Sequence, residues 1–114
     1  MQRASYVQIA PLTLDIGPDE AFAIVRKAAD NLGWRVIEAV PPGGRIGLGR
    51  LEAVDRSLIL RVPYDITIRV RPRVDGTRID IHSASRFGNH DLGANANQIR
   101  DFLEEASNLA IAVR

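Results

Sequence analysis

The stretch LILRVPYDITIRV, residues 58–70, decides the fold. Every even position from Leu58 to Val70 is apolar or aromatic, a period of two sustained over 13 residues. This alternation predicts a long strand with one buried face, bending at Pro63. Asp75-Gly76 then gives the strongest hairpin signal in the chain, so residues 77–86 are predicted to return as the next strand.

The flanking segments complete an α+β pattern. Pro18, followed by two acids, predicts a helix over 18–32 that ends at Gly33, and a three-four apolar rhythm predicts a second helix from 92 or 95 to 112. Shorter strands are expected at 11–16, 34–40 and 45–53, with turns at 41–44 and 54–57. The order β-α-β-β-β-β-α predicts a two-layer sandwich: an antiparallel sheet of four to five strands with both helices on one face.

Composition limits the classes of function. The 114 residues suit one domain, and the content of 46% apolar and 25% charged residues is that of a globular protein. The absence of cysteine excludes disulfides, thiolate zinc sites and a cysteine nucleophile. A net charge of +1 argues against a dedicated nucleic-acid binder, although residues 45–86 hold nine arginines against five acids.

Known catalytic and metal-binding patterns do not fit. His82 and His90 lack the spacing of metal ligands, so we expect no metal and no cofactor. A triad of Ser83 or Ser85 with His90 and Asp91 lacks a nucleophile elbow.

A two-residue turn at Asp75-Gly76 fixes an expected strand register. In that register Asp65 faces Arg86, and Arg71 faces Asp80, on an exposed polar face of the sheet. We therefore expect replacement of Asp80 by alanine to change stability little. The two serines, Ser83 and Ser85, point toward the helices near the start of the second helix.

Residues 80–103, DIHSASRFGNHDLGANANQIRDFL, resemble the hallmark of an uncharacterised bacterial family catalogued as domain of unknown function 1499. The family pattern is a strand ending in Ser-x-Ser-Arg, then Gly, Asp-x-Gly, Asn-Ala, and an Ile-Arg that enters the last helix. The matching residues here are Ser83, Ser85, Arg86, Gly88, Asp91, Gly93, Asn95, Ala96, Ile99 and Arg100. Weaker matches upstream extend the resemblance over nearly the whole chain.

The resemblance implies a context but no substrate. Similar domains often follow transmembrane helices or a lipoprotein-type leader, so residues 1–114 suit the soluble part of a longer, membrane-associated protein as well as a small free-standing protein. The chain as given has no apolar run near the roughly 20 residues of a spanning helix, and we expect it to be soluble and cytoplasmic by default. Where the family has two adjacent aspartates, this chain has Tyr64-Asp65, which puts any role needing both carboxylates in doubt.

Two interpretations of the motif remain open. The first is a polar clasp that fastens the last helix to the sheet, and the second is a small-anion site at the N-terminus of that helix. The candidate residues for binding or for the clasp are Ser83, Ser85, Arg86, Asp91, Asn95, Arg100 and Asp65.

The sequence favours a non-catalytic binding or accessory domain for an unknown small ligand or protein partner. The alternatives are a hydrolase using Asp65, Asp91 or His90, the anion-binding module, and a protein that docks partners through a sheet edge or its arginine-rich face. The oligomeric state is left open.

Overall fold

The computed structural model describes residues 7–43, 47–56, 63–85 and 92–112. These residues form five strands and two helices in the predicted order β-α-β-β-β-β-α. The elements are β1 (Val7–Leu14), α1 (Pro18–Asn31), β2 (Arg35–Val40), β3 (Gly49–Arg56), β4 (Pro63–Arg73), β5 (Gly76–Ser85) and α2 (Leu92–Ala112).

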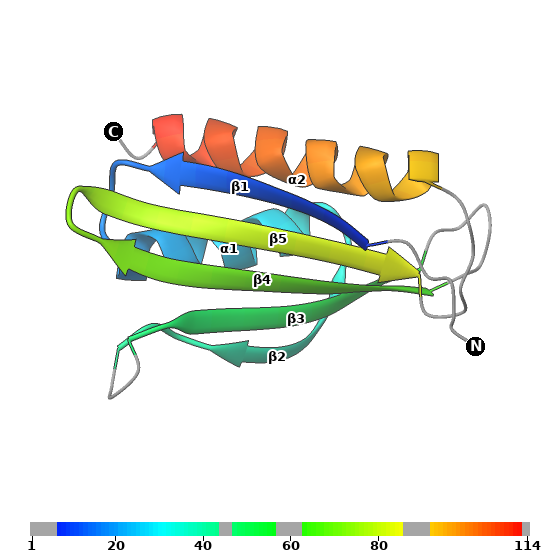
Figure 1. The fold of residues 1–114 in the computed structure, drawn as a ribbon, viewed down its shortest axis with the longest axis horizontal. Coiled ribbons are helices and arrows are strands. Elements are labelled where there is room, and N and C mark those ends of the chain that lie inside the picture. Colours follow the sequence, from blue (N-terminus) through cyan, green and yellow to red (C-terminus); the bar gives the residue numbers. More distant parts are fainter. Residues whose placement is uncertain (1–6, 44–46, 57–62, 86–91, 113–114) are drawn as a thin grey trace.

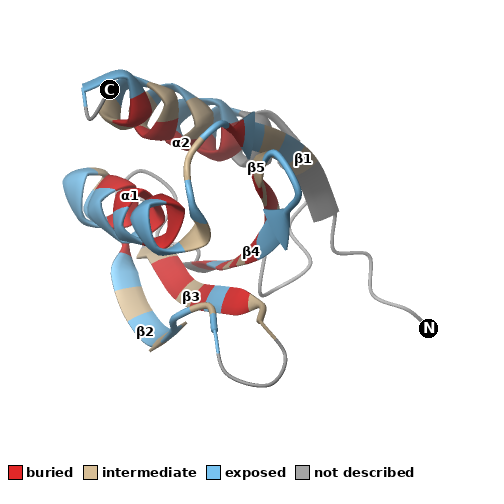
Figure 2. Ribbon diagram, turned by 90° about the vertical axis from the view of Figure 1, so that its left-hand side faces the viewer, coloured by how far each residue is buried: buried red, intermediate tan, exposed pale blue. Residues whose placement is uncertain are grey.

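The five strands form one antiparallel sheet in the order β1-β5-β4-β3-β2. Both helices cover the same face of this sheet, with α2 along β1 and β5 and with α1 over β2 to β4 (Figures 1 and 2). The prediction of a two-layer α+β sandwich is confirmed. The face toward the helices is called the inner face below, and the opposite face is called the outer face.

The core lies between the sheet and the two helices (Figure 2). Alternate residues of β3, β4 and β5 point inward, as period two requires. The helices contribute small alanines, which let them pack close to the sheet, and a few large side chains. Phe102 of α2 and Val25 of α1 are fully buried.

The strand boundaries differ from the sequence prediction most clearly at the end of β3 and at the start of β1. The turn expected at 54–57 is wrong, because residues 54–56 continue β3 and pair with β4 from Asp65 to Pro63. The first strand begins at Val7 instead of residue 11, and it includes Pro11. Proline is tolerated there because β1 is an edge strand, where one row of backbone N–H groups has no partner strand.

The register of the β4–β5 hairpin also corrects the prediction. Arg73 pairs with Gly76, so the two-residue loop is Val74-Asp75 instead of Asp75-Gly76. Gly76 has φ +151°, and a Cβ on it would clash with the carbonyl oxygen of Leu14. The glycine therefore permits the close approach of β1 instead of forming the turn.

The shift by two residues keeps every side chain on its predicted face but changes its partner. Asp65 lies opposite Ala84, and Asp80 lies opposite Arg69. Asp80 is also buried, not exposed, and its carboxylate accepts contacts from Arg71 at 3.3 Å and Arg78 at 2.9 Å. The expectation that Asp80 forms an exposed ion pair that contributes little to stability is wrong.

Candidate functional site

A polar cluster links the inner face of the sheet to α2. We define it as Ser83 of β5, Asp55 of β3, Gln98 of α2 and Trp34, which precedes β2. The Ser83 hydroxyl donates to Gln98 Oε1 at 2.6 Å, and Gln98 Nε2 donates to Asp55 Oδ2 at 2.8 Å. Ser83 is fully buried and Gln98 is 7% exposed, so one amide bridges two strands from within the core.

Burial raises the pKa of the Asp55 carboxyl above its ordinary value, and the negative charge of Asp101 acts in the same direction. Hydrogen bonds from Gln98 and Trp34 lower the pKa and so oppose this effect. Burial is the largest of these causes. Asp55 therefore binds a proton more readily than an ordinary aspartate does.

Trp34 also joins the end of α1 to α2. Its backbone N–H donates to the Ala29 carbonyl at 3.0 Å, which closes the turn after the helix at Gly33, where the sequence predicts the helix to end. The indole stacks on the Phe102 ring with centroids 5.7 Å apart and an interplanar angle of 13°. Trp34 therefore connects the polar cluster to the apolar core through Phe102.

The structure separates the residues that the sequence grouped into one candidate site. Ser83 points toward α2, as the alternation predicts. Asp65 lies between inward-pointing Tyr64 and Ile66, so it is exposed on the outer face, away from Ser83. Arg100 is exposed on α2 and donates to Asn97 Oδ1 at 2.9 Å.

The other candidates lie outside the described part of the structure. Arg86 and Asp91 fall in a segment that is not described, and so does His90. Ser85 and Asn95 belong to β5 and α2 by their backbone, but their side chains are not described. The clasp and the anion site at the start of α2 therefore stay predictions.

Sequence reasoning missed Asp55, Gln98 and Trp34 as members of the polar cluster that contains Ser83. Asp55 was assigned to a turn, although Leu51, Ala53 and Asp55 occupy alternate positions and period two places all three on the inner face. Gln98 lies one helical turn before Phe102, on the buried face of α2. The available signal in the sequence was a polar residue at a position that the periodicity of its strand or helix places in the core.

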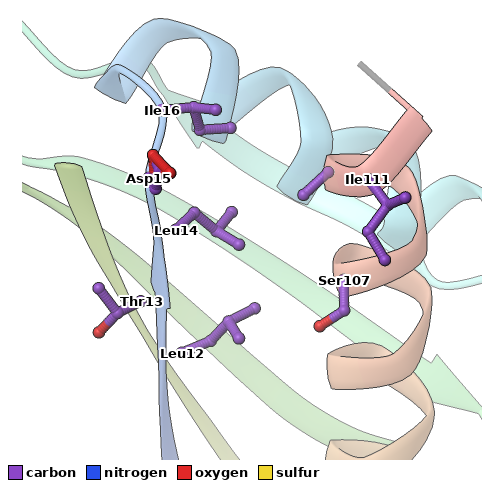
Figure 3. A pocket seen from close by; sticks show the side chains of 8 residues that line it. Leu12, Thr13, Leu14, Asp15, Ile16, Ser107 and Ile111 are labelled. Carbon is purple, nitrogen blue, oxygen red and sulfur yellow. The ribbon is translucent and has the colours of Figure 1, made fainter. Parts of the chain in front are cut away.

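A cleft lies between β1 and the C-terminal half of α2 (Figure 3). Leu12, Leu14 and Ile16 point toward the helix, and Thr13 points away from it. Ser107 points from α2 toward β1, and Ala110 and Ile111 complete the helix wall. This β1–α2 cleft has a volume of about 230 Å³. Ile111 at its mouth is 70% exposed, which is unusual for an isoleucine beside a core.

The β1–α2 cleft is well separated from the polar cluster. Leu14 pairs with Thr77, and Ser83 lies six residues further along β5, about 20 Å away at the rise of a strand. Asp15 is the one titratable residue among those lining the cleft. The two features therefore act independently.

Within the described ranges, no group of three or more metal-binding side chains is close enough to hold a metal ion. The described helices include none with the length and apolar character needed to cross a membrane.

A family model described as "Protein of unknown function (DUF1499)" matches residues 1–105. A search of curated proteins found no significant match. Among solved structures, Thalictrum flavum norcoclaurine synthase in complex with a transition-state analogue has a TM-score of 0.60 at 12% identity, covering 98% of each chain.

Two further solved structures have the same fold. The same synthase in complex with dopamine and hydroxybenzaldehyde has a TM-score of 0.55 at 11% identity, covering 98% of this chain and 90% of that chain. A Rhodobacter sphaeroides protein has a TM-score of 0.55 at 15% identity, covering 95% of this chain and 97% of that chain. At these identities the likeness shows the fold alone.

Proposed function

The chain belongs to the family described as protein of unknown function DUF1499, and we propose that it is a non-catalytic binding domain that holds a small apolar molecule in the β1–α2 cleft. The observation that carries the proposal is the cleft itself, an apolar concavity left open between an edge strand and a long helix. The membrane-associated context implied by the family resemblance is compatible with this role and remains a separate proposal.

The chemistry of the cleft supports an apolar occupant. Leu12, Leu14 and Ile111 offer aliphatic surface from both walls, and the Ser107 hydroxyl supplies a polar group that can orient a ligand. Small-molecule sites in proteins have this character, mostly apolar with few polar groups. The volume of about 230 Å³ is below the usual range of roughly 300–1,000 Å³ for such sites. This size favours a ligand of about one ring.

The fold neighbours support the same occupant class. The norcoclaurine synthase structures have this chain's fold, and one of them is a complex with dopamine and hydroxybenzaldehyde. Each of those molecules contains a single phenol ring. That complex supports a single-ring compound as the class of ligand that we propose for this chain.

The distribution of titratable groups favours binding without turnover. Acid–base catalysis needs an acid and a base, or a nucleophile and a base, within reach of one reacting atom. The cleft is lined by Asp15 alone among titratable residues, and Asp55 lies in the distant polar cluster. The lining of the cleft thus holds one titratable group and no second one that would complete an acid–base pair, and we assign the Ser107 hydroxyl to orienting the ligand.

Titration with p-cresol, a neutral single-ring phenol, tests the proposal by isothermal calorimetry. Ile111→Lys brings a charge to the cleft mouth at an exposed position, so the fold is retained while apolar contact is lost. We expect its affinity for p-cresol to fall by roughly tenfold or more, because burying one aliphatic side chain is worth about 1.5–3 kcal/mol.

Ile37→Lys is the matched control, since Ile37 is an exposed apolar residue on β2, at the edge of the sheet opposite β1. It should bind p-cresol as the parent does. Equal affinity of Ile111→Lys and the parent, or a parent Kd above about 10 mM, would contradict the proposal.

A further inference from the structure

The outer face of the sheet carries a row of arginines. Val40 of β2 pairs with Arg50 of β3, Arg50 pairs with Arg69 of β4, and Arg69 pairs with Asp80 of β5. Residues paired directly across neighbouring strands share a face, so these side chains lie side by side. Two guanidinium groups are thus adjacent in the middle of the sheet.

The carboxylates near this row contact some of the arginines and not others. Arg50 contacts Glu38 at 3.1 Å and Glu52 at 3.4 Å. Asp80 lies opposite Arg69 but is engaged by Arg71 and Arg78.

Arg69 is consequently left without an acidic partner. Among the described residues it has no carboxylate within 4.0 Å, and its Nη1 lies 3.5 Å from Nε2 of His82. Arg69 is half-buried, so its charge is only partly screened by water. A partly desolvated guanidinium group without a counter-ion attracts an anion.

A cleft of about 250 Å³ opens beside Arg69. It is lined by Val40, Leu48, Gly49, Arg50 and Arg69. Val40 is 40% exposed, and Leu48 is half-buried. Gly49 lines the cleft with backbone alone, because a Cβ on it would point to the inner side, against Pro42 and Phe22. The cleft therefore joins an apolar surface to a guanidinium group that has no carboxylate partner.

We propose that this outer-face cleft is a second binding site, specific for a small amphiphilic anion such as an alkyl carboxylate. The carboxylate binds Arg69, whose planar guanidinium group can donate two parallel hydrogen bonds to it. The alkyl chain packs against Val40 and Leu48. Glu38 and Glu52 neutralise Arg50 and disfavour an anion at that arginine, so Arg69 is the anion-binding residue.

This site is independent of the one proposed above. The β1–α2 cleft lies on the inner side of the sheet and contains no arginine, whereas the outer-face cleft is lined by two. The failure of either proposal leaves the other intact.

Three probes, compared at equal ionic strength, distinguish the contribution of the carboxylate from that of the alkyl chain. Hexanoate has both groups, acetate lacks the alkyl chain, and 1-hexanol lacks the charge. Binding is followed by backbone amide shifts in two-dimensional NMR. We expect hexanoate to bind about tenfold more tightly than acetate or 1-hexanol, with the largest shifts at Val40, Leu48 and Arg69.

Arg69→Gln should lower the hexanoate affinity by roughly tenfold or more, whereas Arg73→Gln, on the same strand and face but outside the cleft, should not change it. Arg69→Lys, which keeps the charge but loses the planar donor pair, should bind with intermediate affinity, and it serves as the test if Arg69→Gln does not fold.

Three results would overturn the proposal. An equal loss in Arg73→Gln would mean general charge attraction to the arginine-rich face. A loss in Ile111→Lys instead of Arg69→Gln would mean binding in the β1–α2 cleft. A parent Kd for hexanoate above about 10 mM would mean that no specific site exists.

Discussion

Replacing Gln98 with leucine removes the amide that connects β5, β3 and α2. The variant keeps a side chain of similar size at a position that is 7% exposed, so packing is largely preserved. It withdraws the acceptor that Gln98 provides to Ser83 and the donor that it provides to Asp55. Any loss of stability therefore reports the polar contacts.

The expected size of that loss follows from the two bonds. A neutral bond of the Ser83–Gln98 type is worth about 0.5–1.5 kcal/mol, and a bond to a charged carboxylate about 1.5–3 kcal/mol. Asp55 is only half-buried, which reduces the second value, and the buried leucine regains about 1 kcal/mol. We expect a net loss of about 2 kcal/mol at pH 7, or roughly 10 °C in Tm for a domain of this size.

The loss should be smaller at low pH. Gln98 lowers the pKa of Asp55, so its removal lets that pKa rise further and makes the charged carboxylate more costly to bury. At pH 4 a larger fraction of Asp55 is protonated in the folded protein, and the missing donor matters less. The difference between parent and variant should therefore shrink between pH 7 and pH 4.

Urea unfolding followed by circular dichroism at the two pH values measures this difference. Glu104→Leu is the matched control, because Glu104 is exposed on the same helix and Glu, Gln and Leu have nearly equal helix propensities. A loss below about 0.5 kcal/mol for Gln98→Leu at pH 7, or the same loss in both variants, would refute the polar link between helix and sheet.

Three other substitutions test separate parts of the structure. Burial raises the pKa of Asp55 in the folded protein above 3.8. The stability that the protonated carboxyl contributes is therefore complete below that pH and is lost as the pH rises through the folded-state pKa. Asp55→Asn should gain stability relative to the parent from pH 4 to pH 7, and a pH-independent difference in urea midpoints would contradict this. Gly76→Ala should lower the stability measured by thermal unfolding by more than about 2 kcal/mol, because the new Cβ clashes with the Leu14 carbonyl oxygen and the residue has a positive φ. An unchanged stability would mean that β1 does not lie close to Gly76. Asp80→Ala should lower the free energy of unfolding by about 1–2 kcal/mol, because it removes the carboxylate that Arg71 and Arg78 share. The exposure of the two arginines weakens both contacts and limits the loss to this size. A loss within about 0.2 kcal/mol would instead favour the exposed ion pair that the sequence predicts.

The fold was predictable because its strongest signals are local. The alternation over 58–70 and the three-four rhythm of both helices determine which face of each element is buried. The hairpin register was not predictable in the same way. Gly76 is read as a turn residue from its neighbours, but its position depends on contact with β1, more than 60 residues earlier in the chain.

The candidate sites were less accessible to sequence reasoning. Leu12, Leu14 and Ile111 have the pattern of core residues, and only the packing of α2 against β1 leaves a cleft between them. Gln98 and Asp55 lie 43 residues apart, so nothing local connects them. Similarly, Arg69 is one arginine among fourteen in the sequence, and its lack of a carboxylate depends on how Asp80 is shared in three dimensions.

Intermolecular nuclear Overhauser effects between p-cresol and the protein test the central claim, binding in the β1–α2 cleft, most directly. The account predicts effects from the p-cresol ring to the methyl groups of Leu12, Leu14 and Ile111, which line the cleft from both walls. Effects to Val40 and Leu48 alone, or to no methyl group of the cleft under saturating p-cresol, would contradict it.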